Sequence, residues 1–145
     1  MNIKEVFEDF KIEDYLEQYQ LSIINEMRQN GLDDDTIMQS FLEVPNQQSI
    51  QSFGGGNTIS TITIQVIKKE FFDLLCGEKY ADERQKIYDS KTQKLITIGI
   101  TAKLATILTI SQATIFPVIV LLLPLIKKFG CESYSSIQQE LSRSE

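Results

Sequence analysis

A run of 23 residues without a charged side chain, from Leu104 to Ile126, constrains the fold of this chain more than any other feature. Lys103 precedes the run, and Lys127 and Lys128 follow it. Such a run either crosses a membrane or lies in a protein core, because both places remove apolar side chains from water. The choice between them depends on how the run is divided into helices.

Polar side chains in the first half of the run predict a turn at residues 110–112. The turn separates two helices, residues 95–110 and 114–128, each about 22–24 Å long at a rise of about 1.5 Å per residue. The hydrocarbon core of a bilayer is about 30 Å thick, so both helices are short for a span. We therefore expect a buried helical hairpin, with membrane insertion as the alternative. The interrupting residues are Thr106, Thr109, Ser111, Gln112 and Thr114.

Local signals define the ends of this hairpin. Ser111 is a suitable N-cap for the second helix, and Gly130 after Phe129 is a suitable stop. We expect Pro117 in the first turn, where its missing N–H costs little, and Pro124 further inside, where it bends or ends the helix. The hairpin residues expected to face the core, or the membrane in the alternative, are Leu104, Ile107, Leu108, Phe116, Val120 and Leu122. Lys127 and Lys128 flank them.

Helical spacing of apolar residues also marks the N-terminal third, residues 1–45. The stripe that begins at Ile3 and ends at Met27 predicts one long helix or two collinear ones. Gly31 is expected to stop it, and Asp33–Asp35 to cap a short helix that ends before Pro45. Together they predict a helical hairpin whose inner face consists of Leu16, Tyr19, Ile23, Met27, Ile37, Phe41 and Leu42.

Between these regions, residues 46–57 are polar and glycine-rich, which is typical of a linker. Residues 64–75 keep helical spacing, and the charged segment 80–90 is expected to form the exposed first part of the helix that continues through 95–110. Residues 61–66 and 96–103 also alternate as strands do, so an α+β domain is the alternative. We predict an all-α protein with an acidic module (1–45), a linker (46–57) and an apolar hairpin module (58–145).

Charge is distributed unevenly along the chain. Residues 1–45 hold 11 acidic and 3 basic side chains, whereas the whole chain of 145 residues has a net charge of −6. An acidic third repels phosphate backbones, and no basic cluster with interleaved aromatics follows it, so the sequence argues against nucleic-acid binding.

The sequence contains no histidine, which removes the usual general base and the commonest metal ligand. Cys76 and Cys131 lie far apart without a CxxC motif, and we interpret them as two thiols in a reducing cytosol. Cys76 near Lys79 and Arg84 is more consistent with packing than with an activated thiol. Asp33–Asp35 fit helix capping better than a calcium loop. We expect no enzymatic activity, no cofactor and no metal.

The C-terminal half also resembles small uncharacterised bacterial proteins with an apolar helical hairpin. The resemblance covers residues 68–131 and implies a shared fold, in accessory components of multi-gene systems that include defence against phage. It is carried by Phe71, Phe72, Leu74, Leu75, Cys76, Tyr80, Glu83, Arg84, Ser111, Pro117, Lys127, Lys128, Gly130 and Cys131.

Two functional hypotheses follow from these observations. The first is a non-enzymatic interaction or regulatory protein that binds a protein partner through an acidic surface, with self-association as an additional property. The second is a small effector or toxin that inserts residues 95–128 into the inner membrane. The N-terminus lacks a secretion signal pattern, so we expect a cytoplasmic protein, with the inner membrane as the alternative. The acidic surface is centred on Glu5, Glu8, Glu13, Asp14 and Glu17.

Overall fold

The structure is a computed structural model that describes residues 3–43, 63–90, 92–132 and 134. Every regular element in these residues is helical, which confirms the all-α prediction. The strand alternative is wrong wherever it can be examined, because residues 64–66 and 96–103 lie inside helices. The predicted linker, residues 46–57, lies outside the described residues.

The two apolar helices form the predicted hairpin. Helix α7 spans Gln93–Leu108, and α8 spans Gln112–Phe129 after a short turn. Thr109 ends α7 in the left-handed conformation, and the Ser111 hydroxyl accepts a hydrogen bond from the Thr114 N–H at 3.2 Å. The predicted cap and turn are therefore confirmed, with Thr109 and Ser111 between the helices, whereas Thr106 lies inside α7 and Gln112 and Thr114 lie inside α8.

The expectation for Pro117 is wrong. Helix α8 begins at Gln112, so Pro117 lies beyond its first turn. Pro124 lies inside the helix as predicted but does not end it, since α8 continues to Phe129. Each proline removes one backbone hydrogen bond from the helix. Burial compensates for that loss, since nine of the 18 residues of α8 are buried. The buried set is Ile115, Pro117, Val118, Ile119, Val120, Leu121, Leu122, Leu123 and Ile126.

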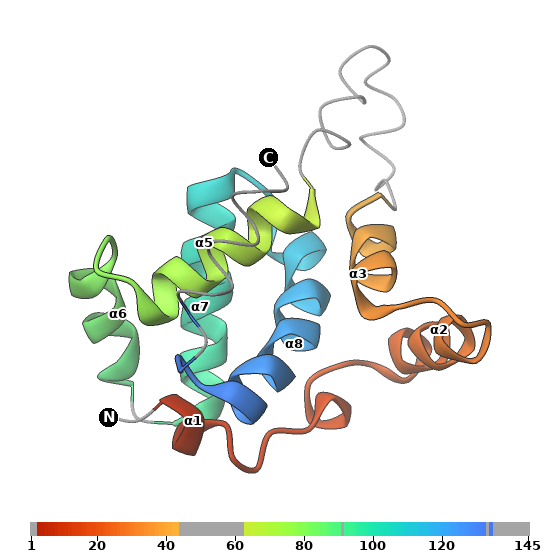
Figure 1. The fold of residues 1–145 in the computed structure, drawn as a ribbon, viewed down its shortest axis with the longest axis horizontal. Helices are drawn as coiled ribbons and strands as arrows, with labels where there is room; N and C mark the ends of the chain where they lie inside the picture. The colour runs from red at the N-terminus through yellow and green to blue at the C-terminus, as the bar shows by residue number, and fades with distance from the viewer. Residues whose placement is uncertain (1–2, 44–62, 91, 133, 135–145) are drawn as a thin grey trace.

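Helix α8 is the centre of the molecule (Figure 1). It packs against α7, against α3 (Asp34–Glu43) and, at its C-terminal end, against α1 (Ile3–Val6). Gly130 ends α8 with a φ of +59°, a conformation that favours glycine. A Cβ atom at Gly130 would lie 3.3 Å from the Cβ of Lys4, so this glycine also lets α1 approach closely.

Helix α5 (Ile64–Cys76) confirms the helical interpretation of residues 64–75. The charged segment after it is a separate helix, α6 (Ala81–Tyr88), and does not run on into α7 as predicted. The chain turns because Tyr88 is buried against α5, where its hydroxyl donates to the Leu75 carbonyl oxygen at 3.4 Å. Gly99 allows α6 to lie close to α7, since a Cβ there would be 3.1 Å from Ile87.

The N-terminal segment differs most from the prediction. Instead of one or two long helices, it forms the single turn α1, a 3-10 turn η1 (Ile12–Asp14) and α2 (Gln18–Gln29). Phe7 and Phe10 are both buried, and the chain leaves the helical path after Val6 and again after Asp14. The stops and caps at Gly31 and Asp33 are confirmed.

The predicted inner face of the α2–α3 hairpin is partly wrong. Tyr19 and Ile23 are 61% and 41% exposed, whereas Ile24 and Met38 are buried. Leu16, Ile37 and Leu42 are buried as predicted. Helix α2 is therefore rotated from the expected orientation, and this rotation leaves apolar side chains at the surface.

Candidate functional site

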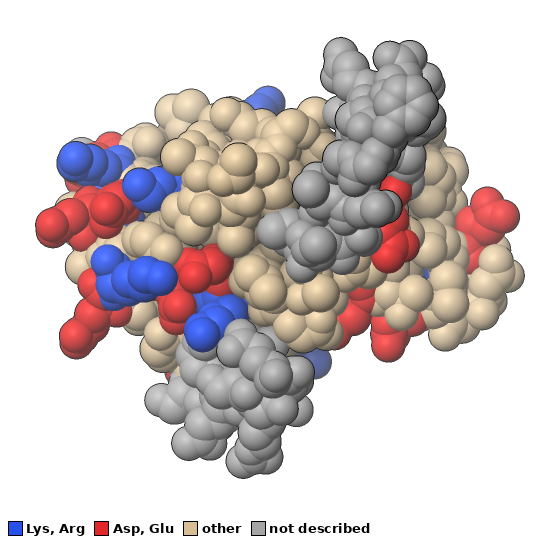
Figure 2. Space-filling view, turned by 90° about the horizontal axis from the view of Figure 1, so that it is seen from above, with Lys and Arg blue, Asp and Glu red and all other residues tan. Residues whose placement is uncertain are grey.

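The five acidic residues proposed for partner binding are all exposed, but they fall into two groups. Glu13, Asp14 and Glu17 lie on η1 and at the start of α2. Glu5 and Glu8 lie at the other end of the segment, beside the C-terminus of α8. Figure 2 shows that the side of the molecule carrying α2 and α3 has acidic surface with little basic surface, whereas both signs mix at the opposite end.

A groove in which five of the nine lining residues are aromatic or aliphatic lies next to the first acidic group, and we call it the apolar groove. It encloses about 380 Å³ between the start of α2 on one side and α7 and α8 on the other. Among the residues that line it, Glu17 is the charged one. The lining residues are Tyr15, Glu17, Tyr19, Gln20, Ile98, Thr101, Gln112, Ala113 and Phe116.

Tyr15 fixes one wall of the groove. Its hydroxyl donates to Gln93 Oε1 at 2.6 Å, and its ring stacks on Phe10 with centroids 5.0 Å apart. Gln93 Nε2 in turn donates to the Val6 carbonyl oxygen at 3.1 Å. Burial raises the pKa of Tyr15, and the charge of Asp14 adds to the shift. The wall is thus held by contacts to both α1 and α7.

The rim of the groove exposes large apolar side chains. Tyr19 is 61% exposed and Ile98 is 48% exposed. Ile23 follows Tyr19 by one helical turn, and Leu95 precedes Ile98 by one turn, with 51% of Leu95 exposed. Neighbouring exposed apolar residues that line a concave surface are typical of binding sites.

Glu17 combines surface charge with a structural task. It is the N-cap of α2, where its side chain and that of Gln20 satisfy backbone N–H groups reciprocally. The Gln20 Oε1 atom accepts from the Glu17 N–H at 2.9 Å. Replacing Glu17 would therefore alter the helix as well as the charge, so Glu13 and Asp14 are better probes of charge alone.

Glu5 and Glu8 line a second cavity, of about 550 Å³, with Lys4, Lys127 and Glu132. Lys127 Nζ donates to the Phe10 carbonyl oxygen at 3.0 Å, which ties the N-terminal segment to the end of α8. Lys128 Nζ lies 5.2 Å from the Phe129 ring centroid. The lysines that follow the apolar run therefore contact the protein itself in this structure.

The apolar hairpin residues are mostly in the core. Leu104, Val120 and Leu122 have no exposed surface, and Ile107, Leu108 and Phe116 are half-buried. Within the described part of the chain, α8 alone is long and apolar enough to cross a membrane by length and composition. Core helices of soluble proteins have the same properties, and half of that helix is buried here.

Cys76 and Cys131 form a disulfide, so the interpretation of two free thiols is wrong. The two Cα atoms lie 5.6 Å apart, because the end of α5 meets the turn after α8. The sequence separation of 55 residues hid this proximity, which only the helix packing creates. A disulfide persists in oxidising compartments. Reduced thiols therefore no longer support the expectation of a cytoplasmic protein, which now depends on the lack of a secretion signal pattern.

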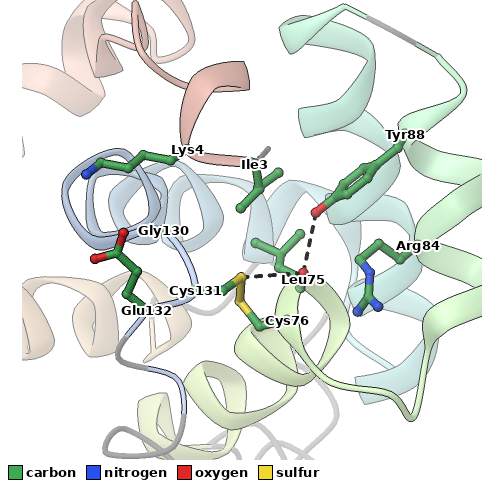
Figure 3. A pocket seen from close by; sticks show the side chains of 9 residues that line it. All are labelled: Ile3, Lys4, Leu75, Cys76, Arg84, Tyr88, Gly130, Cys131 and Glu132. Carbon is green, nitrogen blue, oxygen red and sulfur yellow. Dashed lines mark hydrogen bonds between the residues drawn. A yellow bond between two sulfur atoms is a disulfide. The ribbon is translucent and has the colours of Figure 1, made fainter. Parts of the chain in front are cut away.

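The disulfide lines a cavity of about 490 Å³ together with Ile3, Arg84 and Tyr88 (Figure 3). Arg84 Nη1 donates to the carbonyl oxygens of Leu74 and Gly77, so the guanidinium caps the C-terminus of α5. Burial raises the pKa of Tyr88 to about 12. Cys131 Sγ lies 3.7 Å from the Leu75 carbonyl oxygen, a contact rather than a hydrogen bond because a disulfide sulfur carries no proton.

The three consecutive aspartates have separate structural partners. Asp33 Oδ1 accepts from the Thr36 N–H at 2.8 Å, which caps α3 and lowers the pKa of Asp33, so the predicted capping is confirmed for Asp33. Asp34 pairs with Arg28 at 3.2 Å, and Asp35 pairs with Lys68 at 2.7 Å. Among the described residues, no group of three or more potential ligands of the His, Cys, Asp and Glu types is placed to hold a metal ion.

Comparisons of the chain with protein-family models, with curated proteins and with solved structures found no match. The candidate site therefore depends on the geometry alone. Sequence reasoning identified the acidic residues beside the groove but missed the groove itself, because Tyr19 was expected in a core. Ile98 was also missed, since α7 is apolar on several faces and its periodicity does not indicate which face is exposed.

Proposed function

We propose that this chain is a non-enzymatic interaction protein that binds a protein partner through its acidic N-terminal surface. The observation that supports the proposal best is the position of Glu13, Asp14 and Glu17, which are exposed beside uncovered apolar side chains. Charge provides orientation and a high rate of association, and apolar contact provides affinity. The resemblance to bacterial accessory proteins suggests a role in a multi-gene system, such as defence against phage.

The test compares partner capture by charge-reversed variants in the source cells. The variants are Glu13→Lys/Asp14→Lys and Glu5→Lys/Glu8→Lys, and the matched control is Glu43→Lys/Glu78→Lys, which changes the net charge equally at distant exposed positions. We expect the first variant to lose captured protein and the control to retain it. Equal capture by all three variants would contradict the proposal.

A second candidate function is membrane insertion, for which the length and composition of α8 are the favourable observation. Insertion requires α8 to leave α3 and α7, and the disulfide restrains its C-terminal end. Fractionation of cells that express the untagged chain at low level tests this candidate and the predicted location together. A pellet that resists washing at high pH supports insertion, and a cytosolic monodisperse protein rejects it.

A further inference from the structure

We infer that the apolar groove beside Tyr19 and Ile98 takes the apolar face of a cationic amphipathic helix of the partner protein. The inference rests on the proposed function and adds the chemistry of what is bound. Three observations on the groove lead to it: its shape, the side chains on its rim and the charge beside it. The first two distinguish a polypeptide from a small molecule, and the third fixes the sign of the polypeptide's charge.

Exposed apolar side chains also occur beyond the residues that line the groove. Tyr19 and Ile98 line it, and Ile23 and Leu95, one helical turn away along α2 and along α7, are exposed as well. A small-molecule site buries most of its ligand inside one cavity. An extended apolar surface instead fits side chains spaced at i, i+3 and i+4 along a bound helix.

The floor of the groove needs no polar partner from a ligand. Thr101 is 3% exposed, and its hydroxyl already donates to the Thr97 carbonyl oxygen at 2.9 Å. Phe116 supplies an aromatic surface from α8, and Ala113 leaves room above it. No buried side-chain polar atom in the described residues lacks a hydrogen-bond partner. The exposed Tyr19 and Ile98 side chains and the Phe116 ring favour contact with apolar side chains such as Leu, Ile or Met, beside the polar Gln20 and Gln112.

The charge beside the groove selects the flanking residues of the partner. Glu17 lines the groove, and Glu13 and Asp14, in the preceding 3-10 turn η1, are exposed. Lysine or arginine residues beside the apolar face of a bound helix would pair with these carboxylates, whereas acidic residues would be repelled. A second copy of this chain carries the same acidic groove, which disfavours self-association at this surface.

The probe for the test is a synthetic helix in which Leu occupies one face and Lys the other, labelled with fluorescein. Its match has Glu in place of Lys. Both peptides are titrated with the full oxidised chain, and fluorescence anisotropy gives the dissociation constants at two salt concentrations. The groove variant is Ile98→Ser, and Leu32→Ser is the control, since Leu32 is 40% exposed and lies outside the groove.

We expect the Leu/Lys peptide to bind and the Leu/Glu peptide not to bind. Ile98→Ser should weaken binding about tenfold, the loss expected for one buried aliphatic contact. Leu32→Ser should change it less than about twofold. Glu13→Lys/Asp14→Lys should weaken binding and remove most of its salt dependence, whereas Glu43→Lys/Glu78→Lys should retain both. Circular dichroism confirms that each variant folds.

The outcomes separate the groove from the acidic surface. If charge reversal weakens binding and cell capture but Ile98→Ser changes neither, the proposed function stands and the groove inference is wrong. If neither change has an effect, both are wrong. A concentration-dependent dimer that Ile98→Ser converts to a monomer, seen by light scattering, would assign the groove to a second copy and overturn the inference.

Discussion

The N-terminal segment, residues 3–29, is built differently from the C-terminal helices α5, α7 and α8. Helix α8 buries nine of its 18 residues and α5 buries six of its 13, so each contributes a broad face to the core. Helix α2 buries only Ile24 among its 12 residues, and α1 buries only Ile3. Broad buried faces hold the C-terminal helices in place, whereas a few buried side chains and hydrogen bonds hold the N-terminal segment.

The anchors of the N-terminal segment are single side chains and hydrogen bonds. Phe7 and Phe10 are buried between the elements, Gln93 holds the Val6 carbonyl, and Lys127 holds the Phe10 carbonyl. The C-terminal helices are also joined covalently by the disulfide. Local opening is easiest where buried apolar contacts are few. The acidic residues of the proposed binding surface therefore lie on the region that opens more easily, and α7 and α8 provide the rigid wall of the groove.

Removal of the disulfide should have the largest effect on this comparison. In Cys76→Ser/Cys131→Ser, the loop of 55 residues is no longer closed in the unfolded state, which lowers the free energy of unfolding by about 4 kcal/mol. Urea unfolding followed by circular dichroism measures the change. Reduction of the wild-type chain should lower stability by a similar amount, and a loss below about 1 kcal/mol would contradict the role of the disulfide.

Truncation of a core side chain should have the next largest effect. Leu122 has no exposed surface, so Leu122→Ala leaves a cavity in the core beside α8 and lowers the free energy of unfolding by about 3 kcal/mol. Ile23→Ala on α2 should change it by less than about 0.5 kcal/mol, since Ile23 is 41% exposed and alanine favours helix. Equal losses for the two variants, measured by urea unfolding, would show that the regions do not differ as described.

The sequence predicted the C-terminal region well because its signals are local. Ser111 caps α8, Gly130 ends it, and the turn between α7 and α8 lies where polar residues interrupt the apolar run. Glycine and hydroxyl side chains act within a few residues of their position, so their effects can be derived from the sequence. The end of α6 was missed because it depends on the burial of Tyr88 against another helix.

The candidate site was less predictable because it depends on contacts between distant elements. Exposure of the five acidic residues follows from their charge, but the rotation of α2 that exposes Tyr19 does not. The same limit applies to the pairing of Cys76 with Cys131, since only the packing of α5 and α8 brings them together. Helical spacing identifies a face of a helix without identifying the neighbour that covers it.

The hydrogen bond between Lys127 and Phe10 offers a smaller and more local test of the comparison. In Lys127→Met the Phe10 carbonyl loses its donor, so residues 3–15 should exchange their amide hydrogens about tenfold faster. Hydrogen exchange with mass spectrometry measures this rate, and α5 should exchange as before. Lys128→Met is the control, because Lys128 contacts Phe129 and not the N-terminal segment. Faster exchange in both variants would reject the anchor.

Alkaline pH should produce the smallest effect, and Tyr88 on α6 is the side chain that reports it. Burial raises the pKa of Tyr88 from 10.0 to about 12, so the folded state favours the neutral phenol. Its contribution to stability is present below about pH 10 and is lost as the pH rises toward 12. Between about pH 10 and about pH 11 this loss amounts to about 1 kcal/mol.

Tyr88→Phe cannot ionise, so its unfolding free energy should fall about 1 kcal/mol less than that of the wild type over this interval. Tyr19→Phe, at a side chain that is 61% exposed, should fall as the wild type does. A Tyr88→Phe curve parallel to the wild-type curve would mean that Tyr88 is not buried as the structure describes, and that α6 is held as loosely as the N-terminal segment.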